Sequence, residues 1–170
     1  AWKKGPVAVA GNIGYPLSAA IRNMTSQGVV IAEISSFQLE TITSFRPKIA
    51  AILNISRNHL DWYPGMDEYA RAKFRIFDYQ TAEDIALLNL DNYELMNRLP
   101  DIASRKMFFS TTQSVDYGVM LAGNRIIYRD GSHEVNVCDK CDLGLPGCHN
   151  LENAMAGIAI ACTMGIPAID

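Results

Sequence analysis

The sequence predicts an α/β domain built on a doubly wound, mostly parallel sheet with a small antiparallel appendage. The apolar run in the first half of Val29–Glu40 is typical of a strand buried on both faces. A further buried strand is expected over Ile49–Ile55 and another strand over Ile85–Asn89. Segments with helical patterns separate these runs, which indicates βαβ units with right-handed crossovers. Turn signals at Gly123-Asn124 and Asp130-Gly131 then divide three short strands, as in hairpins.

The first elements are marked by glycine and proline. Val7–Ala10 is expected as a short strand that ends at a glycine turn. A helix is expected over Leu17–Gln27, because Gly28 follows as a typical C-terminal stop. After the strand that begins at Val29, a second helix is expected near Phe37–Ser44, with Pro47 soon after it.

Three further helices are expected along the rest of the chain. Asp67–Tyr79 repeats polar residues on one face at helical spacing. Asp91 is the expected N-cap of a helix over Asp91–Leu99, and Asn150 that of a helix from about Leu151 to Met164. The remaining expected strands are Ile85–Asn89, Arg105–Ser110, Gly118–Ala122, Arg125–Tyr128 and Glu134–Cys138.

Composition narrows the classes of protein and partner. The chain has 170 residues, 49% of them hydrophobic, and a net charge of -3. This length suits one domain with a real core, and the lack of a basic stripe argues against a nucleic-acid partner. No apolar run approaches a membrane span and no signal peptide is visible, so we expect no membrane partner. Four cysteines fit a reducing cytoplasm. Because the chain lacks an initiator Met, we expect a domain from a longer protein.

Polar residues follow three of the expected strands. They are Asn12, Glu33 with Ser35, and Asn54 with His59, and a parallel sheet would place all three groups at one edge. A carboxylate in an apolar strand needs a partner, which a bound cation would supply. Glu33 and His59 with oxygen ligands suit Mg²⁺ or Mn²⁺, and magnesium usually accompanies phosphates. The alternatives are a structural ion pair or a half-exposed position for Glu33, and an ordinary loop histidine for His59.

Lys73 does not share the polar face of its helix. Its neighbours at helical spacing are apolar or aromatic: Tyr69, Ala70, Ile76 and Phe77. A lysine in this setting either extends its amine to water or has an amine whose pKa is lowered.

A competing metal site is conceivable near the end of the chain. Cys138, Cys141, Cys148 and His149 have a spacing that a Cys₃His zinc site could use. The alternative is a set of reduced loop cysteines, since one Cys-x2-Cys pair is weak evidence in an α/β domain.

Five motifs occur in an order that one family shares. They are Gly11-Asn12-Ile13-Gly14-x-Pro16, Glu33-x-Ser35-Ser36-Phe37-Gln38-Leu39-Glu40, Asn54-Ile55-Ser56-x-x-His59-Leu60-Asp61, Tyr69-x-x-Ala72-Lys73-x-x-Ile76-Phe77 and Gly147-x-His149-Asn150-x-x-Asn153-Ala154. Together they resemble the central, ATP-binding domain of the Mur ligases over nearly the whole chain. The first two motifs are most similar to the members that add D-glutamate.

The resemblance implies a three-layer, Rossmann-like fold related to P-loop NTPases, in a cytoplasmic enzyme of peptidoglycan synthesis. In such enzymes ATP phosphorylates the carboxylate of UDP-N-acetylmuramoyl-L-alanine, and the amine of D-glutamate attacks the acyl phosphate. The family's P-loop would precede Val7, and its N-terminal and C-terminal domains would flank residues 1–170. The chain would then be a central-domain fragment that lacks ligase activity by itself.

The resemblance also implies a metal centre in which Glu33 and His59 hold magnesium. Lys73 corresponds to a lysine that CO₂ carbamylates, and the carbamate helps to organise the second magnesium. Apolar neighbours agree with this role, because a carbamate forms only on a neutral amine. Arg57 and Asn58 precede His59, where the family more often has Pro and Asp.

For the substrates, the resemblance implies that Asn12, Ser35 and Gln38 face the UDP-muramoyl group. Asn153 would reach the adenine, with His149 and Asn150 nearby. Two alternatives stay open. One is another enzyme of the superfamily, such as a diaminopimelate- or lysine-adding ligase or a folylpolyglutamate synthetase. The other is a non-catalytic interaction domain stabilised by zinc.

Overall fold

The computed structural model describes residues 5–144 and 146–167, apart from the side chain of Asn23. The chain divides into two compact units, residues 1–43 and residues 44–170, and each is described by itself. Among the described helices, none is both long and apolar enough to cross a membrane.

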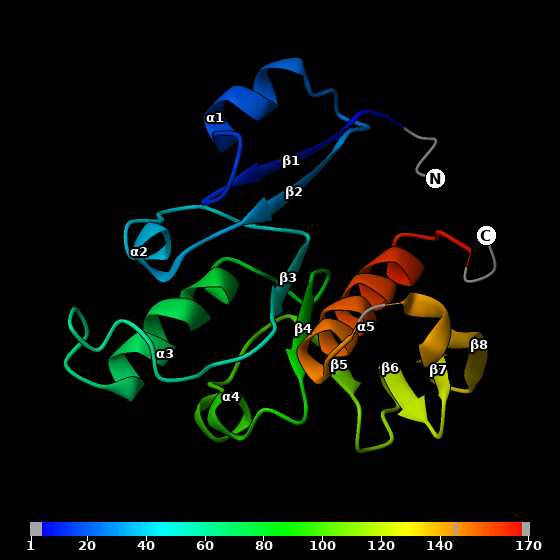
Figure 1. Ribbon diagram of the computed structural model, residues 1–170. Helices are drawn as coiled ribbons and strands as arrows, with labels where there is room; N and C mark the ends of the chain where they lie inside the picture. The colour runs from blue at the N-terminus through cyan, green and yellow to red at the C-terminus, as the bar shows by residue number, and fades with distance from the viewer. Residues whose placement is uncertain (1–4, 145, 168–170) are drawn as a thin grey trace. The chain divides into compact units, whose positions relative to one another are not determined.

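The first unit is a small parallel sheet with two short helices (Figure 1). Strand β1 (Val7–Gly11) pairs in parallel with β2 (Val29–Glu33), and the two form a sheet of their own. Helix α1 (Leu17–Ala20) continues into a 3-10 turn (Ile21–Asn23) between the strands. Helix α2 (Ser36–Leu39) follows β2.

Both helices of this unit are shorter than the sequence predicts. The helix expected over 17–27 ends at Asn23, because Met24 is extended with a ψ of 144°. The amide of Gly28 then donates to the carbonyl of Thr25 at 2.9 Å, which closes a turn. The helix expected over 37–44 ends at Leu39. Residues 41–43 are all β-branched, and such residues are disfavoured in helices.

The sequence predicts that β2 is buried on both faces, and this is wrong. Ile31 is 56% exposed and Glu33 is exposed, while the other residues of β2 are half-buried. The reason is that β1 is its one hydrogen-bonded neighbour among the described strands. A two-stranded sheet has few neighbouring elements that could cover it.

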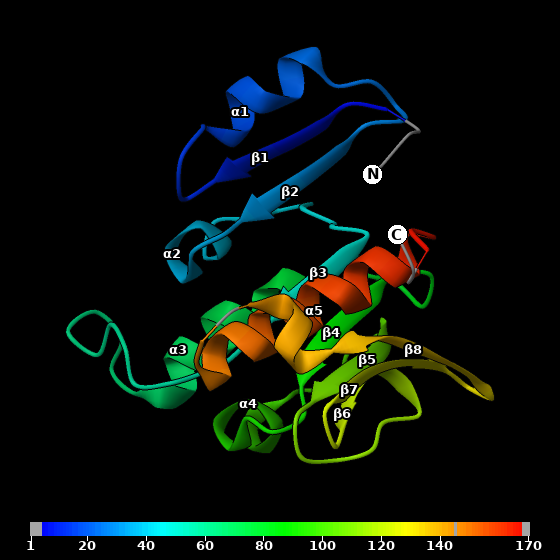
Figure 2. The same ribbon diagram turned by 45° about the vertical axis from the view of Figure 1, so that its right-hand side comes forward.

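The second unit is a six-stranded sheet between two helical layers (Figures 1 and 2). The strands follow one another in chain order, parallel up to β6 and antiparallel from β6 to β8. They are β3 (Ile49–Ile52), β4 (Ile85–Asn89), β5 (Arg105–Ser110), β6 (Tyr117–Ala122), β7 (Arg125–Asp130) and β8 (His133–Asp139). The predicted α/β class, the mostly parallel sheet and the antiparallel appendage are confirmed, although the parallel strands divide between two sheets.

Helices cover both faces of this sheet. Helix α3 (Met66–Phe74), extended by the 3-10 turn η2 (Arg75–Phe77), and α4 (Tyr93–Arg98) lie on one face. Helix α5 (Cys148–Thr163), preceded by the 3-10 turn η3 (Lys140–Leu143), lies on the other.

Strand β4 lies at the centre of the core. Ala86 and Leu88 pack toward α3 and α4, whereas Ile85 and Leu87 pack toward Met155 of α5. Leu87 and Leu88 are both fully buried, and burying one such side chain stabilises a fold by about 1.5–3 kcal/mol. The predicted strand over Ile85–Asn89 is therefore confirmed, and it is buried on both faces.

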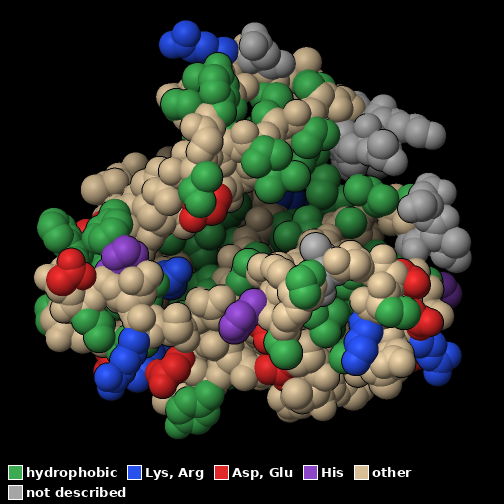
Figure 3. All heavy atoms as spheres, in the orientation of Figure 1, with side chains coloured by type: hydrophobic (Ala, Val, Ile, Leu, Met, Phe, Trp, Pro, Cys, Tyr) green, Lys and Arg blue, Asp and Glu red, His purple; other side chains and the backbone are tan. Residues whose placement is uncertain are grey.

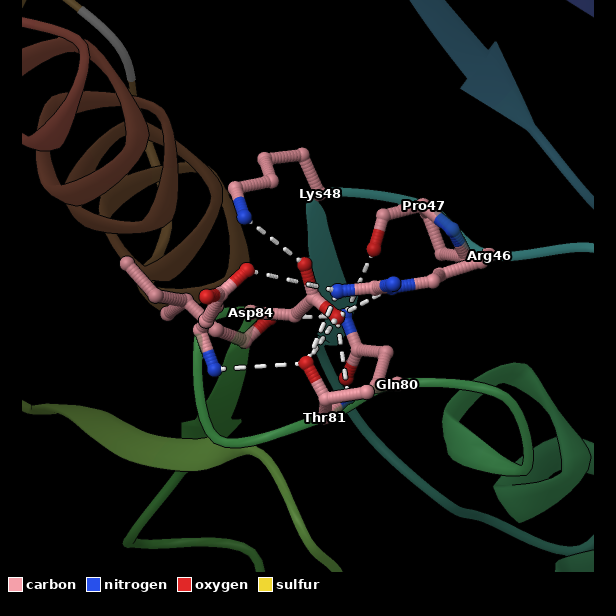
Figure 4. Close-up of polar contacts among 8 residues, drawn as sticks. Arg46, Pro47, Lys48, Gln80, Thr81 and Asp84 are labelled. Atoms are coloured by element: carbon pink, nitrogen blue, oxygen red, sulfur yellow. Dashed lines mark hydrogen bonds and ion pairs between the residues drawn. The ribbon is translucent and has the colours of Figure 1, made fainter.

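A buried carboxylate locks the starts of β3 and β4 together (Figure 4). Asp84 is 1% exposed, and its Oδ2 accepts from Nε of Arg46 at 2.6 Å and from the amide of Thr81 at 2.8 Å. Its Oδ1 accepts from Nζ of Lys48 at 3.0 Å. Beside it, Nε2 of Gln80 donates to the carbonyl of Pro47 at 2.9 Å. The hydrogen bond from Arg46, followed by that from Thr81, holds the pKa of Asp84 well below its ordinary value of 3.8, although burial opposes this.

We predict that Asp84→Asn lowers stability at pH 7, because it removes the ionic partner of two cations. A carboxyl whose pKa is depressed by folding stabilises the protein above its unfolded pKa and loses this contribution as the pH falls. The difference between wild type and variant should therefore shrink below about pH 4. Urea unfolding at pH 7 and at pH 3 measures this. The exposed Asp101→Asn is the control, and a difference that is constant across pH would contradict the account.

Candidate functional site

The carboxyl ends of β1 and β2 bring two predicted site residues together. Gly11 lies opposite Glu33 in the parallel register, and the amide of Asn12 donates to the carbonyl of Glu33 at 2.7 Å. Gly11 has a φ of 126°, and a Cβ there would lie 2.1 Å from that carbonyl oxygen. The glycine is therefore needed for the close approach of the two strand ends.

Ser35 and Gln38 form the capping box of α2. Oγ of Ser35 accepts from the amide of Gln38 at 3.3 Å, and Oε1 of Gln38 accepts from the amide of Ser35 at 2.9 Å. These bonds begin the helix immediately after Glu33. The first unit thus brings four predicted residues to the carboxyl ends of β1 and β2: Asn12, Glu33, Ser35 and Gln38.

The second unit brings His59 and Lys73 to the same aromatic ring. The ring of Tyr69, which is 4% exposed, meets the His59 ring edge-on, with centroids 6.1 Å apart. Nζ of Lys73 lies 5.3 Å from the centroid of the same ring, within the range of a cation–π contact. Tyr63 packs on Tyr69 with centroids 5.4 Å apart. The predicted aromatic surroundings of Lys73 are confirmed for Tyr69. Whether Glu33 of the first unit joins His59 and Lys73 stays a prediction.

The backbone at His59 is strained. Its φ is 55°, and among the described residues it is the one non-glycine residue with a positive φ. Asn58 Oδ1 accepts from the amide of His59 at 3.0 Å, and the His59 carbonyl accepts from the amides of Trp62 and Tyr63, both at 3.0 Å. Such a conformation costs about 1–3 kcal/mol and is typical of functional sites.

A polar hollow of about 220 Å³ lies where β3 and β4 end beside the start of α5. Its lining combines strand-end amides with the first turns of that helix: Asn54, Ser56, Asn89, Asp91, Asn92, His149 and Glu152. The structure thus brings the predicted residue His149 to the strand end that carries Asn54. A crevice at the carboxyl ends of parallel strands is the usual place for a ligand in α/β folds.

Two neighbouring side chains shape one wall of this hollow. Asn92, and not Asp91 as the sequence predicts, is the N-cap of α4, and its Oδ1 accepts from the amides of Leu95 at 2.9 Å and Ile55 at 3.1 Å. Asp91 instead accepts from Ser110 at the end of β5 and from Thr111 and Thr112 in the loop that follows. Burial raises the pKa of Asp91, but these hydrogen bonds outweigh it and leave the pKa below its ordinary value.

Comparison with known proteins identifies the family. The family model of the Mur ligase middle domain matches residues 5–161. The chain belongs to the Mur ligase family.

Among its relatives, the UDP-N-acetylmuramoylalanine–D-glutamate ligase of Pelotomaculum thermopropionicum is 44% identical over 93% of this chain and 35% of its own length. The enzyme of the same name from Clostridioides difficile is 46% identical, over 90% of this chain and 34% of its own length. The chain therefore spans about a third of the length of these relatives.

A solved structure agrees in fold. The MurF ligase from Thermotoga maritima in complex with ADP matches with a TM-score of 0.62 and 16% identity, over 98% of this chain and 47% of that chain. The α/β fold described above is thus the fold of a Mur ligase middle domain.

The Mur ligase motif around His149 lies on α5, which begins earlier than the sequence predicts. The helix starts at Cys148 with Gly147 as N-cap, so Asn150 lies in the first turn and is not the cap. Nδ2 of Asn150 donates to the carbonyl of Pro146 at 2.7 Å. Asn153 is exposed one turn further along. The three predicted nucleotide residues therefore share the first two turns of one helix, and only His149 of the three lines the hollow.

The zinc alternative finds no support among the described residues. Across residues 5–144 and 146–167, no three His, Cys, Asp or Glu side chains gather into a group that could hold a metal ion, and this range includes all four proposed ligands. Cys138 lies in β8, next to its last residue, and burial raises the pKa of its thiol. Figure 3 shows acidic and basic side chains interspersed over α3 and α4, where Arg98 pairs with Asp67 and Glu94.

Sequence reasoning missed four residues of the hollow, Asn89, Asp91, Asn92 and Glu152, although it placed Asp91 at the start of a helix. Asn89 carried the same signal as Asn54, since it is a polar residue that ends a buried strand. Glu152 gave no signal, because a glutamate in the first turns of a helix is ordinary on any surface.

We predict that the ring of Tyr69, and not its hydroxyl, supports this part of the Mur ligase fold. Tyr69→Ala should cost about 3–5 kcal/mol, as other large-to-small changes in cores do. Tyr69→Phe keeps the ring and should cost less than about 1.5 kcal/mol. Urea unfolding measures both, with the more exposed Tyr79→Phe as control. Equal losses for the two variants of Tyr69 would show that the hydroxyl matters instead.

Proposed function

We propose that this chain is the nucleotide-binding middle part of an ATP-dependent ligase that joins D-glutamate to UDP-N-acetylmuramoyl-L-alanine. The observation that carries the proposal is the family match over residues 5–161, together with relatives that are 44% and 46% identical and named as D-glutamate ligases. Such an enzyme works in peptidoglycan synthesis, in the cytoplasm. The rest of the same protein would supply the other substrate-binding domains.

The hollow beside α5 supports a nucleotide at the carboxyl edge of the sheet. His149 lines it, and Asn150 and Asn153 lie on the same two helical turns. In the proposal Asn153 reaches the adenine, and His149 and Asn150 support the nucleoside. Carboxamides suit this task because each offers both a donor and an acceptor to a base edge. The MurF ligase of similar fold is described with ADP bound.

The donor set also fits a divalent cation. Glu33 offers an exposed carboxylate at a strand end, and His59 offers an imidazole on a loop fixed by Asn58 and Tyr69. Bound there, magnesium would neutralise charge on the phosphate oxygens. In the proposal Glu33 and His59 hold the same cation, with Lys73 as a carbamate that adds oxygen ligands.

The remaining roles concern the other substrate. Asn12 and the capping box of Ser35 and Gln38 would face the UDP-muramoyl group, since they lie beside Glu33 on the same strand edge. Orienting the substrate carboxylate toward ATP allows phosphoryl transfer to it. The amine of D-glutamate then attacks the acyl phosphate, which releases phosphate and forms the amide.

The test is amino-acid-dependent ADP release by the full-length protein with UDP-N-acetylmuramoyl-L-alanine and ATP. We predict release with D-glutamate that exceeds release with L-lysine or meso-diaminopimelate by at least about a hundredfold, because a site built for one side chain leaves buried polar groups unpaired with another. The control omits the UDP-sugar. A preference for diaminopimelate, lysine or a folate substrate would assign the chain to another branch of the superfamily.

A further inference from the structure

We propose that Asn89 is a positioning residue that holds the nucleotide-contacting end of α5 in place through Glu152. This inference rests on the proposed function. Asn89 ends β4 and is 2% exposed. Its Nδ2 donates to the carbonyl of Leu53 at 3.0 Å and to Oε2 of Glu152 at 3.2 Å, and its Oδ1 accepts from the amide of Asp91 at 3.0 Å.

This carboxamide joins three segments that are distant in sequence. Leu53 is 36 residues from Asn89 and directly precedes Asn54, where the chain leaves β3 toward His59. Glu152 is 63 residues away and lies between His149 and Asn153. One side chain therefore joins the end of β3, which leads to the loop that carries His59, to the helix that carries His149 and Asn153.

The chemistry of position 89 explains why a carboxamide is needed. Ile85, Leu87 and Asn89 alternate onto the face of β4 that α5 covers, and the first two of them are apolar. A buried polar group in such a row is costly unless its hydrogen bonds are made. Asn89 uses both amide hydrogens and its oxygen. A leucine would fill the space but leave the Leu53 carbonyl and Glu152 without this donor.

The rotation of the start of α5 depends on the hydrogen bond between Asn89 and Glu152. Its N-cap is Gly147, which offers no side-chain cap. Further along, Met155, Ala156 and Ala159 pack on the sheet. Apolar contacts of this kind hold a helix against a sheet without fixing its rotation closely, because the hydrophobic effect is non-directional. The directed bond between Asn89 and Glu152 supplies that constraint one turn from His149, at the wall of the hollow that all three line.

The test measures the Kd of ADP in the presence of Mg²⁺ by calorimetry on the full-length protein. Asn89→Asp keeps the size of the side chain but turns an oxygen toward Glu152, and the Kd should rise about three- to tenfold. The double variant Asn89→Asp with Glu152→Gln places a donor opposite the introduced carboxylate. It should reverse at least half of the change in log Kd that Asn89→Asp causes. Glu134→Gln on β8, which removes the charge that pairs with Arg129, is the matched control and should leave the Kd unchanged.

The Kd separates positioning from folding, because a misfolded fraction lowers the number of binding sites and not their affinity. Should Asn89→Asp fail to fold, Glu152→Ala on α5 tests the same bond and should show the same rise. An unchanged Kd in either folded variant, or a double variant no better than Asn89→Asp, would overturn the inference. A wild-type protein that does not bind ADP would instead overturn the proposed function, and this inference with it.

Discussion

Parallel pairing of β3 with β4 is the constraint on which the candidate site of the second unit depends. The register runs from Ile49 opposite Ile85 to Ile52 opposite Leu88, so both strands end at the same edge. Two polar bridges fasten the pair. Asp84 ties the starts of the strands through Arg46 and Lys48, and Asn89 ties their ends through the carbonyl of Leu53. Between these bridges the strands are held by their backbone hydrogen bonds and by apolar side-chain packing, which leaves the strand ends as the place for polar side chains.

The strand with every residue buried, β4, is among the elements that the sequence predicts best. The bounds of β4 and β5 agree with the prediction, because an apolar run bounded by polar residues leaves little choice of register. The first unit is predicted less well, since the exposure of β2 depends on how many strands flank it and not on its own residues. Helix ends are the weakest point. Asn150 precedes an apolar stripe as an N-cap does, yet the helix already begins at Cys148.

Some residues of the candidate site can likewise be found from the sequence, whereas other features of the site cannot. Strand-end residues such as Asn12, Glu33 and Asn54 can be found from sequence, because their position follows from where an apolar run stops. The contact of the Tyr69 ring with Lys73 follows from helical spacing. Its contact with His59 cannot be found in that way, since it depends on how α3 packs against the loop after β3. The bond between Asn89 and Glu152 is equally invisible, because the two residues lie on elements far apart in the chain.

The central proposal is that Glu33 and His59 both hold the divalent cation that accompanies ATP. A double-mutant cycle on Mn²⁺ affinity, measured by electron paramagnetic resonance on the full-length protein with ATP present, tests it most directly. If Glu33 and His59 serve the same centre, Glu33→Gln and His59→Ala should each weaken Mn²⁺ binding, and the double variant should lose less than the sum. Fully additive losses, or no loss in either variant, would contradict the account.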